Sequence, residues 1–235
     1  MKVRLRQLGI VMTILGLVFA LAGIFALTQV RAGYDSLEAF SEAQGVELSY
    51  NDDGQLVDRG TVEGADAIMA LLEDDWGYPV NRADFDSSDP LVNTATEYMY
   101  QMATIGYHVL HGTQTVVLTE AVEYNGETFE AGVYEFSVDG RYWTGFARTD
   151  LLDGPARDGA WSGTAHALVA ELGVGAATHS TLQLALGVAA LLAGLGFVCT
   201  VMGAALIWAS KAKDEKSEVD KFIESTLPQK ELETV

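Results

Sequence analysis

Residues 182–209 read LQLALGVAALLAGLGFVCTVMGAALIWA, a run of twenty-eight residues without a charged side chain. The hydrocarbon core of a bilayer is about 30 Å thick, and roughly 20 apolar residues in a helix cross it. A helix of this length and uniform apolarity would be abnormal in the core of a soluble protein. The stretch therefore predicts a transmembrane helix, and the rest of the chain is interpreted around it.

A second apolar run occupies residues 8–30, directly after a short basic segment (residues 1–7) that contains Lys2, Arg4 and Arg6 and no acid. A cleaved signal peptide has the same order of segments. Its apolar region is usually about 7–15 residues long, and a small-residue cleavage site follows it. This run is longer and has no clean cleavage site before Arg31, so we favour a retained transmembrane helix.

Both predicted spans carry a stripe of small residues at spacings of 4, 3, 4 and 3. The stripes are Gly9, Thr13, Gly16, Ala20 and Gly23 in the first span, and Ala189, Ala193, Gly196, Thr200 and Gly203 in the second. Small residues let helix backbones approach closely in lipid, and a repeat of 3.5 residues keeps one seam facing its partner. The stripes predict that the spans pack as an antiparallel pair. The alternative is that Gly and Ala are simply frequent in this chain and in transmembrane helices.

The distribution of basic residues predicts the orientation. Three basic residues precede the first span, and Lys211, Lys213 and Lys216 follow the second. The positive-inside rule then places residues 1–7 and the tail, residues 210–235, in the cytoplasm, with residues 31–181 outside the plasma membrane. Trp208 suits an anchor at the inner interface.

The negative charge is concentrated in the predicted outer region. The chain has a net charge of −19, and residues 31–181 contain 26 acidic against six basic residues. Such a surface disfavours nucleic acid and anionic lipid as ligands, and suits cations, a basic partner or a solvated acidic face. The single cysteine, Cys199, lies within the second span, so no intrachain disulfide is expected.

The longest helix predicted in the outer region runs from Asp89-Pro90, a strong N-terminal signal, to Gly112. Its apolar stripe is Leu91, Ala95, Tyr98, Met102, Ile105 and Val109, and its opposite stripe is Thr94, Glu97, Gln101, Thr104, His108 and His111. The pattern predicts an amphipathic helix packed on one side. A third span over the uncharged residues 98–119 is a less favoured alternative.

Glu97, His108 and His111 share the polar face of this helix, and two histidines at i, i+3 can bind zinc. A solvated helix face explains the same residues, and no further ligand cluster accompanies them, so a metal site is a minor alternative. The sequence contains no G-x-S-x-G, P-loop, H-E-x-x-H or dinucleotide fingerprint. It predicts no catalytic residue and no cofactor.

Residues 114–148 predict a three-stranded antiparallel β-meander with turns at Asn125-Gly126 and Asp139-Gly140. The helix at 90–111 is expected to cover it. Shorter helices are expected at residues 34–43, 64–73 and 157–172. The predicted fold is an α+β extracytoplasmic domain, with helices packed on a small β-meander, inserted between two transmembrane helices.

The run DPLVNTATEYMYQMATIGYHVLHGTQTVVL (residues 89–118), set between two Gly/Ala-rich spans, resembles small two-pass envelope proteins of actinobacteria. The resemblance implies the two-pass topology and carries no activity. We expect a non-enzymatic plasma-membrane protein that acts as an accessory, assembly or sensing component through protein partners, in contact with the lipid bilayer and not with nucleic acid. The alternatives are an envelope hydrolase or a cation-binding module that uses the outer acids and histidines.

Overall fold

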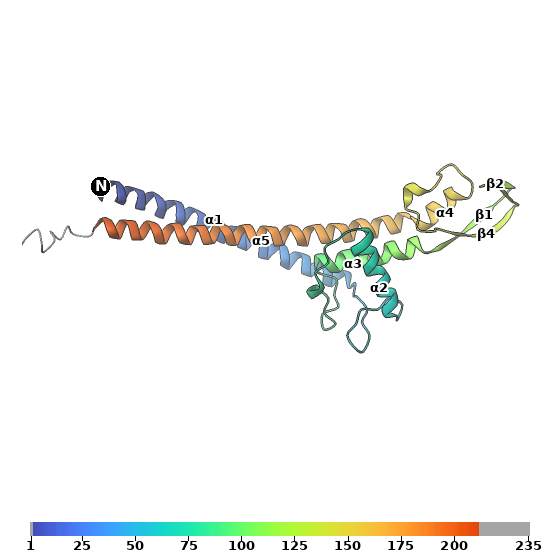
Figure 1. The fold of residues 1–235 in the computed structure, drawn as a ribbon, viewed down its shortest axis with the longest axis horizontal. Coiled ribbons are helices and arrows are strands. Elements are labelled where there is room, and N and C mark those ends of the chain that lie inside the picture. Colours follow the sequence, from blue (N-terminus) through green and yellow to red (C-terminus); the bar gives the residue numbers. More distant parts are fainter. Residues whose placement is uncertain (1, 212–235) are drawn as a thin grey trace, which may run out of the picture. The chain divides into compact units, whose positions relative to one another are not determined.

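The computed structural model describes residues 2–211, which form two compact units (Figure 1). The first unit comprises residues 2–28 and 187–211, and the second comprises residues 29–186. All but the first two residues of the predicted cytoplasmic tail lie outside the described residues. Two long apolar helices flank a small domain that contains further helices and two antiparallel β-sheets.

The two long helices are α1 (Lys2–Gln44) and α5 (Gly163–Ser210). In the first unit they run side by side in opposite directions (Figure 1). Both are long and apolar enough to cross a membrane, judged by length and composition. The short helix predicted at residues 34–43 is the end of α1.

Helix α5 continues without a break through Gly173, Gly175 and residues 178–181. Packing explains the glycine at position 175, because a Cβ built there would lie 2.6 Å from Cε1 of Tyr98. The glycine allows α5 to pass against this ring, and a close tertiary contact overrides a helix propensity loss of about 1 kcal/mol.

The core of the second unit lies between α2 (Val62–Ala70), α3 (Ala95–Leu110) and the adjoining parts of the long helices. A π-helical turn, Leu71–Asp75, extends α2, and a 3-10 turn, Arg82–Asp84, precedes α3. The buried cluster contains Leu37, Leu48, Ala65, Ile68, Met69, Leu72, Val92, Tyr98, Tyr100, Ala103, Leu172 and Ala176. Helix α3 is therefore covered on several sides, and the prediction that it packs on one side only is wrong.

Helix α3 does not begin at Asp89-Pro90 as predicted. The Pro90 carbonyl accepts a hydrogen bond from the Leu48 N–H at 2.8 Å, and this pairing holds the segment extended. The helix starts instead at a capping box, in which Thr94 Oγ1 accepts from Glu97 N–H and the Glu97 carboxylate accepts from Thr94 N–H. This box satisfies two backbone donors at once.

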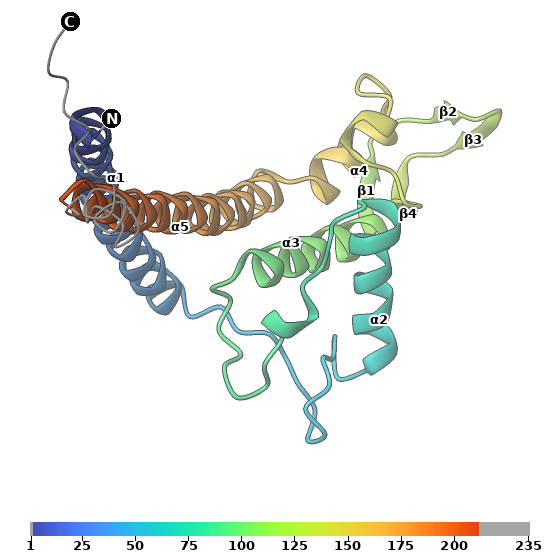
Figure 2. The same ribbon diagram turned by 60° about the vertical axis from the view of Figure 1, so that its left-hand side comes forward.

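The β region is a long hairpin with a separate sheet at its tip (Figure 2). Strand β1 (Thr113–Leu118) pairs antiparallel with β4 (Gly132–Ser137), and β2 (Val122–Tyr124) pairs antiparallel with β3 (Glu127–Phe129). The predicted Asn125-Gly126 turn joins β2 to β3, and both residues have positive φ, 52° and 82°.

The third strand of the predicted meander is wrong, because residues 143–145 form a 3-10 turn. The Trp76 indole N–H donates to Tyr142 Oη at 2.8 Å, and the Tyr142 ring stacks on Trp161 at 5.7 Å. The aromatic residues of this segment therefore pack against helices, and the segment does not extend the sheet.

The predicted cover of the sheet is also wrong. Helix α4 (Asp153–Ala160) packs on β1, and α3 contributes only its C-terminal end, chiefly Leu110, to this second buried cluster. The helix predicted at residues 157–172 is divided after Ala160, because Trp161 leaves the helical conformation and its indole N–H donates to the Arg141 carbonyl.

Candidate functional site

The small-residue stripes of α1 and α5 face each other in the first unit. A Cβ built on Gly16 would lie 2.5 Å from Thr200 N and 2.7 Å from Gly196 O, and one built on Gly23 would lie 2.6 Å from Ala193 N. These separations are shorter than real Cβ atoms show, so only glycine fits at these positions. The backbones are in direct contact along this surface, which we call the seam.

All ten predicted seam residues lie at or beside this contact. The positions that take part in close approaches are Gly9, Thr13, Gly16, Ala20, Gly23, Ala189, Ala193, Gly196, Thr200 and Gly203. The buried members repeat every seven residues, as Gly9, Gly16 and Gly23 on α1 and as Ala189, Gly196 and Gly203 on α5. Residues with low numbers on α1 meet residues with high numbers on α5, as in an antiparallel pair.

The two threonines of the seam do not link the helices through their hydroxyl protons. Thr13 Oγ1 donates to the Gly9 carbonyl at 2.9 Å, and Thr200 Oγ1 donates to the Gly196 carbonyl at 2.8 Å. Each hydroxyl is therefore satisfied within its own helix. Close packing of backbone and small side chains is what holds the seam together.

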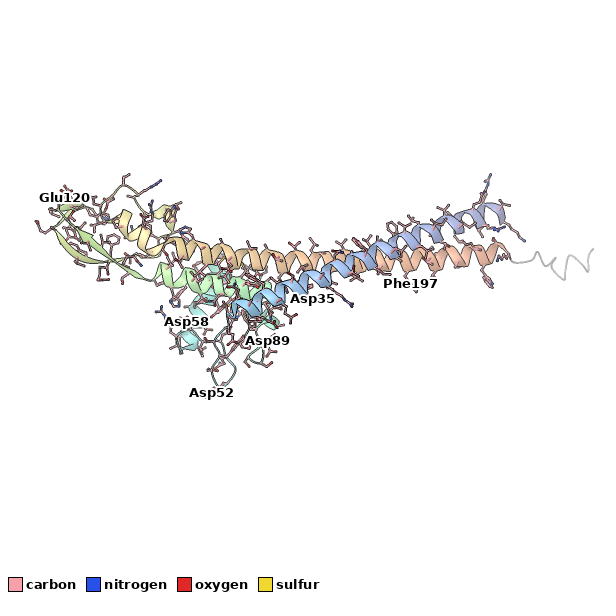
Figure 3. All side chains as sticks on the ribbon, turned by 180° about the vertical axis from the view of Figure 1, so that it is seen from behind. Asp35, Asp52, Asp58, Asp89, Glu120 and Phe197 are labelled. Carbon is pink, nitrogen blue, oxygen red and sulfur yellow. The ribbon has the colours of Figure 1, made fainter. Side chains whose placement is uncertain are left out.

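The large apolar residues of the same helices point away from the seam. Leu21 is 67% exposed, Phe197 69% and Leu184 71%. Figure 3 shows Phe197 among the side chains that line the outside of α5. Small residues form the interior of the pair and bulky apolar residues form its exterior, the reverse of a water-soluble helical hairpin.

The three candidate metal or catalytic residues are not brought together. Glu97 lies at the N-terminal end of α3, and eleven residues separate it from His108, which corresponds to about 16 Å along a helix. Among residues 2–211, no group of three or more His, Cys, Asp or Glu side chains is placed to hold a metal ion.

Each of these three residues has a structural partner. Glu97 is 2% exposed, and its Oε2 accepts from the N–H groups of Asn93 and Thr94 at 3.1 and 2.9 Å. Burial raises the pKa of this carboxyl, and the hydrogen bonds oppose the shift. The expectation that Glu97 lies on a solvated face is wrong, because its side chain closes the start of α3.

The histidines of α3 contact different groups. His108 Nε2 lies 2.9 Å from Asp58 Oδ1, and both side chains are partly buried. His111 is exposed, its Nδ1 donates to the Tyr107 carbonyl at 2.9 Å, and its ring lies 4.2 Å from the Tyr107 ring. The first histidine thus ties α3 to the turn before α2, and the second caps the end of α3.

A polar centre that the sequence did not reveal lies under α4. Asp153 is 4% exposed and accepts hydrogen bonds from Tyr124 Oη, from an Arg141 guanidinium N–H and from the Ala147 N–H, at 2.8–2.9 Å. Burial alone would raise the pKa of Asp153, but these bonds outweigh it and hold the pKa below its usual value. Arg141 is one of only six basic residues among residues 31–181, and the scarcity of basic residues there is the signal in the sequence that could have pointed to it.

His179 is a further buried polar group of the second unit. Its ring meets that of Tyr34 edge to face at 5.6 Å, and its Nδ1 is buried without a hydrogen-bond partner in the described residues. Burial lowers the pKa of this imidazole, and the charge of Asp84 opposes the shift. The neutral form is therefore the one that the folded unit favours.

No protein-family model, curated protein or solved structure matches this chain. The resemblance to two-pass envelope proteins stays a prediction. The two surfaces of the helix pair that bear on function are the seam and the apolar exterior.

Proposed function

We propose that this chain is a non-enzymatic two-pass plasma-membrane protein that presents its acidic α+β domain outside the cell. In this proposal the seam pairs the two spans in lipid, and the outer domain acts as an accessory, assembly or sensing component through protein contacts. The resemblance to two-pass envelope proteins would follow from this topology.

The inverted distribution of apolar residues carries the membrane assignment. In water, bulky apolar residues on the outside of a helix pair would form an exposed patch far larger than the few hundred Å² that soluble monomers show. In lipid the same exterior is favourable, because the acyl chains are as apolar as leucine. Glycine-lined backbone contact is also the usual means by which helices associate where no hydrophobic force drives them together.

The charge distribution supports the orientation. Lys2, Arg4 and Arg6 precede the first span and Lys211 follows the second, whereas the region between the spans carries a charge of −20. Basic residues near short flanking segments stay on the cytoplasmic side. Acidic loops such as that containing Asp52, labelled in Figure 3, would then face the exterior.

The hydrolase alternative gains no support from its candidate residues. Glu97 closes the start of α3, His108 contacts Asp58, and His111 contacts Tyr107. These contacts account for all three side chains through folding, so we favour a role in protein contacts.

Cysteine accessibility tests the topology. In a Cys199→Ala background, a membrane-impermeant maleimide applied to intact cells should label Asp52→Cys and should label Arg4→Cys only after permeabilisation. Asp52 and Arg4 are both exposed, so the contrast reports sidedness and not burial. The opposite pattern, or release of the protein by alkaline carbonate, would overturn the membrane assignment.

The accessory role has its own test. Photo-cross-linking amino acids at exposed sites of the outer domain, such as Val133, should capture a distinct protein in native membranes, and a probe at the lipid-facing Leu184 should not. Adducts to lipid alone at both sites would contradict action through protein contacts.

A further inference from the structure

Three adjoining apolar cavities follow α5 within the second unit. The first, of about 310 Å³, is lined by Val174, Ala177, Thr178, Thr181 and Leu182. It shares Val174 and Thr178 with a cavity of about 630 Å³ that also contacts α1 at Gly33, Ser36, Leu37 and Phe40. That cavity in turn shares Phe40 and Glu171 with a third, of about 200 Å³, which reaches Val92 and Ile105. Together they form one path, which we call the groove.

The groove begins where the predicted second span begins, at Leu182. It extends along α5 as far as Leu168, and at a rise of 1.5 Å per residue these fourteen residues correspond to about 21 Å. Its outer part is open, and its inner part lies between α1, α3 and α5 under Val46 and Val92. A path of this kind runs from Leu182, where the predicted span begins, to the core of the second unit.

Two hydroxyl groups beside the inner end are paired with each other. Ser41 Oγ donates to the Leu37 carbonyl at 3.0 Å and lies 2.6 Å from Tyr98 Oη. The Ser41 proton is used within its helix, so Tyr98 is the donor of the second bond. An occupant therefore finds no unsatisfied hydroxyl at these two residues, and the wall, which also includes Gln44, Gln101 and Glu171, is mostly apolar.

We infer that the groove binds a single hydrocarbon chain of a membrane amphiphile, an inference that rests on the membrane insertion proposed above. One leaflet of a 30 Å hydrocarbon core holds chains that extend about 15 Å, so the groove is long enough for one. The lining of the inner end is mostly apolar, which suits a hydrocarbon chain.

The position of the groove specifies how the chain enters. The groove begins at Leu182, where the predicted second span begins, so the chain enters from the outer leaflet. The end of the chain then lies at the inner end of the groove, and the head group stays at the outer end beside Thr178 and Thr181.

The test uses the full-length protein in phosphatidylcholine nanodiscs with a monoacylglycerol that carries a photoreactive diazirine near the end of its C16 chain. After irradiation, peptide mapping should find adducts in residues 98–105 or 40–46, at the inner end of the groove. Adducts in residues 8–30 and 182–209 serve as the internal control for membrane insertion.

Two matched tryptophan variants separate groove binding from general labelling. Val174 lines the outer groove and is 66% exposed, and Val133 lies on β4 and is 67% exposed. Val174→Trp should reduce the inner adducts at least about tenfold, the change expected from losing about 1.4 kcal/mol of binding, and Val133→Trp should leave them unchanged.

The outcomes distinguish this inference from the proposed function. Adducts confined to the spans, or inner adducts that Val174→Trp does not reduce, would overturn chain binding and leave the membrane assignment intact. Spans without adducts would overturn both. A dimer seen by native mass spectrometry that Val174→Trp dissociates would assign the groove to a second copy of the chain and would also overturn the inference.

Discussion

A single methyl group at Gly196 should weaken the pairing of the two spans, whereas the same methyl group two residues earlier should not. A Cβ at Gly196 would meet Ala20 N and would lie 2.8 Å from Gly16 O, whereas one at Gly194 meets nothing within 4 Å. Restoring the lower limit of ordinary contact, 3.4 Å, to the Gly16 oxygen requires the backbones to separate by about 0.6 Å, and the closer Ala20 nitrogen requires more. Gly194→Ala thus controls for the change in helix propensity.

The size of the effect follows from this separation. A gap of about 0.5–1 Å loses a quarter to a half of the attraction of each contact that it affects, and overpacking of a close interface costs about 1–3 kcal/mol. We therefore expect Gly196→Ala to shift the equilibrium between paired and separated spans by roughly 5- to 150-fold relative to Gly194→Ala.

Distance measurements between spin labels provide the assay. Nitroxides at the outward-facing Leu17 and Phe197, in a Cys199→Ala background, report the paired state by double electron–electron resonance during titration of mild detergent with SDS. Gly196→Ala should separate the spans at a lower SDS fraction than Gly194→Ala. Equal midpoints for the two variants would refute the seam as the source of the pairing energy.

Three further predictions concern the second unit, residues 29–186, measured by chemical and thermal unfolding. Asp153→Ala should lower the free energy of unfolding by about 2–4 kcal/mol, because it leaves the Arg141 guanidinium without its carboxylate partner. The folded pKa of Asp153 is lowered, so the stability that its carboxylate contributes is present above the unfolded pKa of about 3.9 and is lost as the pH falls through the folded pKa. Asp153→Ala should lack this pH dependence. Glu97→Gln keeps the acceptor of the capping box and removes a carboxylate whose pKa is raised by burial, so it should lose less stability at pH 7 than Glu97→Ala. The stability of the wild type relative to Glu97→Gln should increase as the pH falls through the folded pKa. Equal losses of stability in the two variants would contradict this. Burial lowers the pKa of His179, so the unfolded state binds more protons near pH 6 and stability should fall on acidification through about 6.5; His179→Phe should flatten that slope, and an unchanged slope would show that another group causes it.

The features that the sequence predicted correctly are those that neighbouring residues determine. The two apolar helices follow from uninterrupted apolar length, and the Asn125-Gly126 turn follows from the positive φ that these residues tolerate. The start of α3 was misplaced because Pro90 pairs with Leu48, forty-two residues earlier. A local helix signal gave way to a distant backbone hydrogen bond, and no periodicity in the sequence reports such a bond.

The candidate site shows the same difference between features that neighbouring residues determine and features that distant contacts determine. A helical wheel places Glu97 opposite the apolar stripe, and the expectation of a solvated face follows only if one side of the helix is covered. In the structure Tyr98, Tyr100 and Ala103 are all buried, although they point in different directions around α3. The long helices and α2 surround α3, so burial of its polar stripe depends on tertiary packing that composition does not encode.

The heptad of α1 explains why one helix can form both a tight seam and a groove. The position that is glycine at 9, 16 and 23 becomes Val30 and then Leu37, and both of these side chains are buried. Glycine lets a backbone touch its neighbour, whereas valine and leucine hold a neighbour away by the length of their side chains. Where bulky residues take the heptad position, space remains beside them, and the cavity between Leu37, Phe40 and Gly175 is such a space. The change from glycine to leucine along one stripe therefore separates a stretch built for helix pairing from a stretch that leaves space for a hydrocarbon chain.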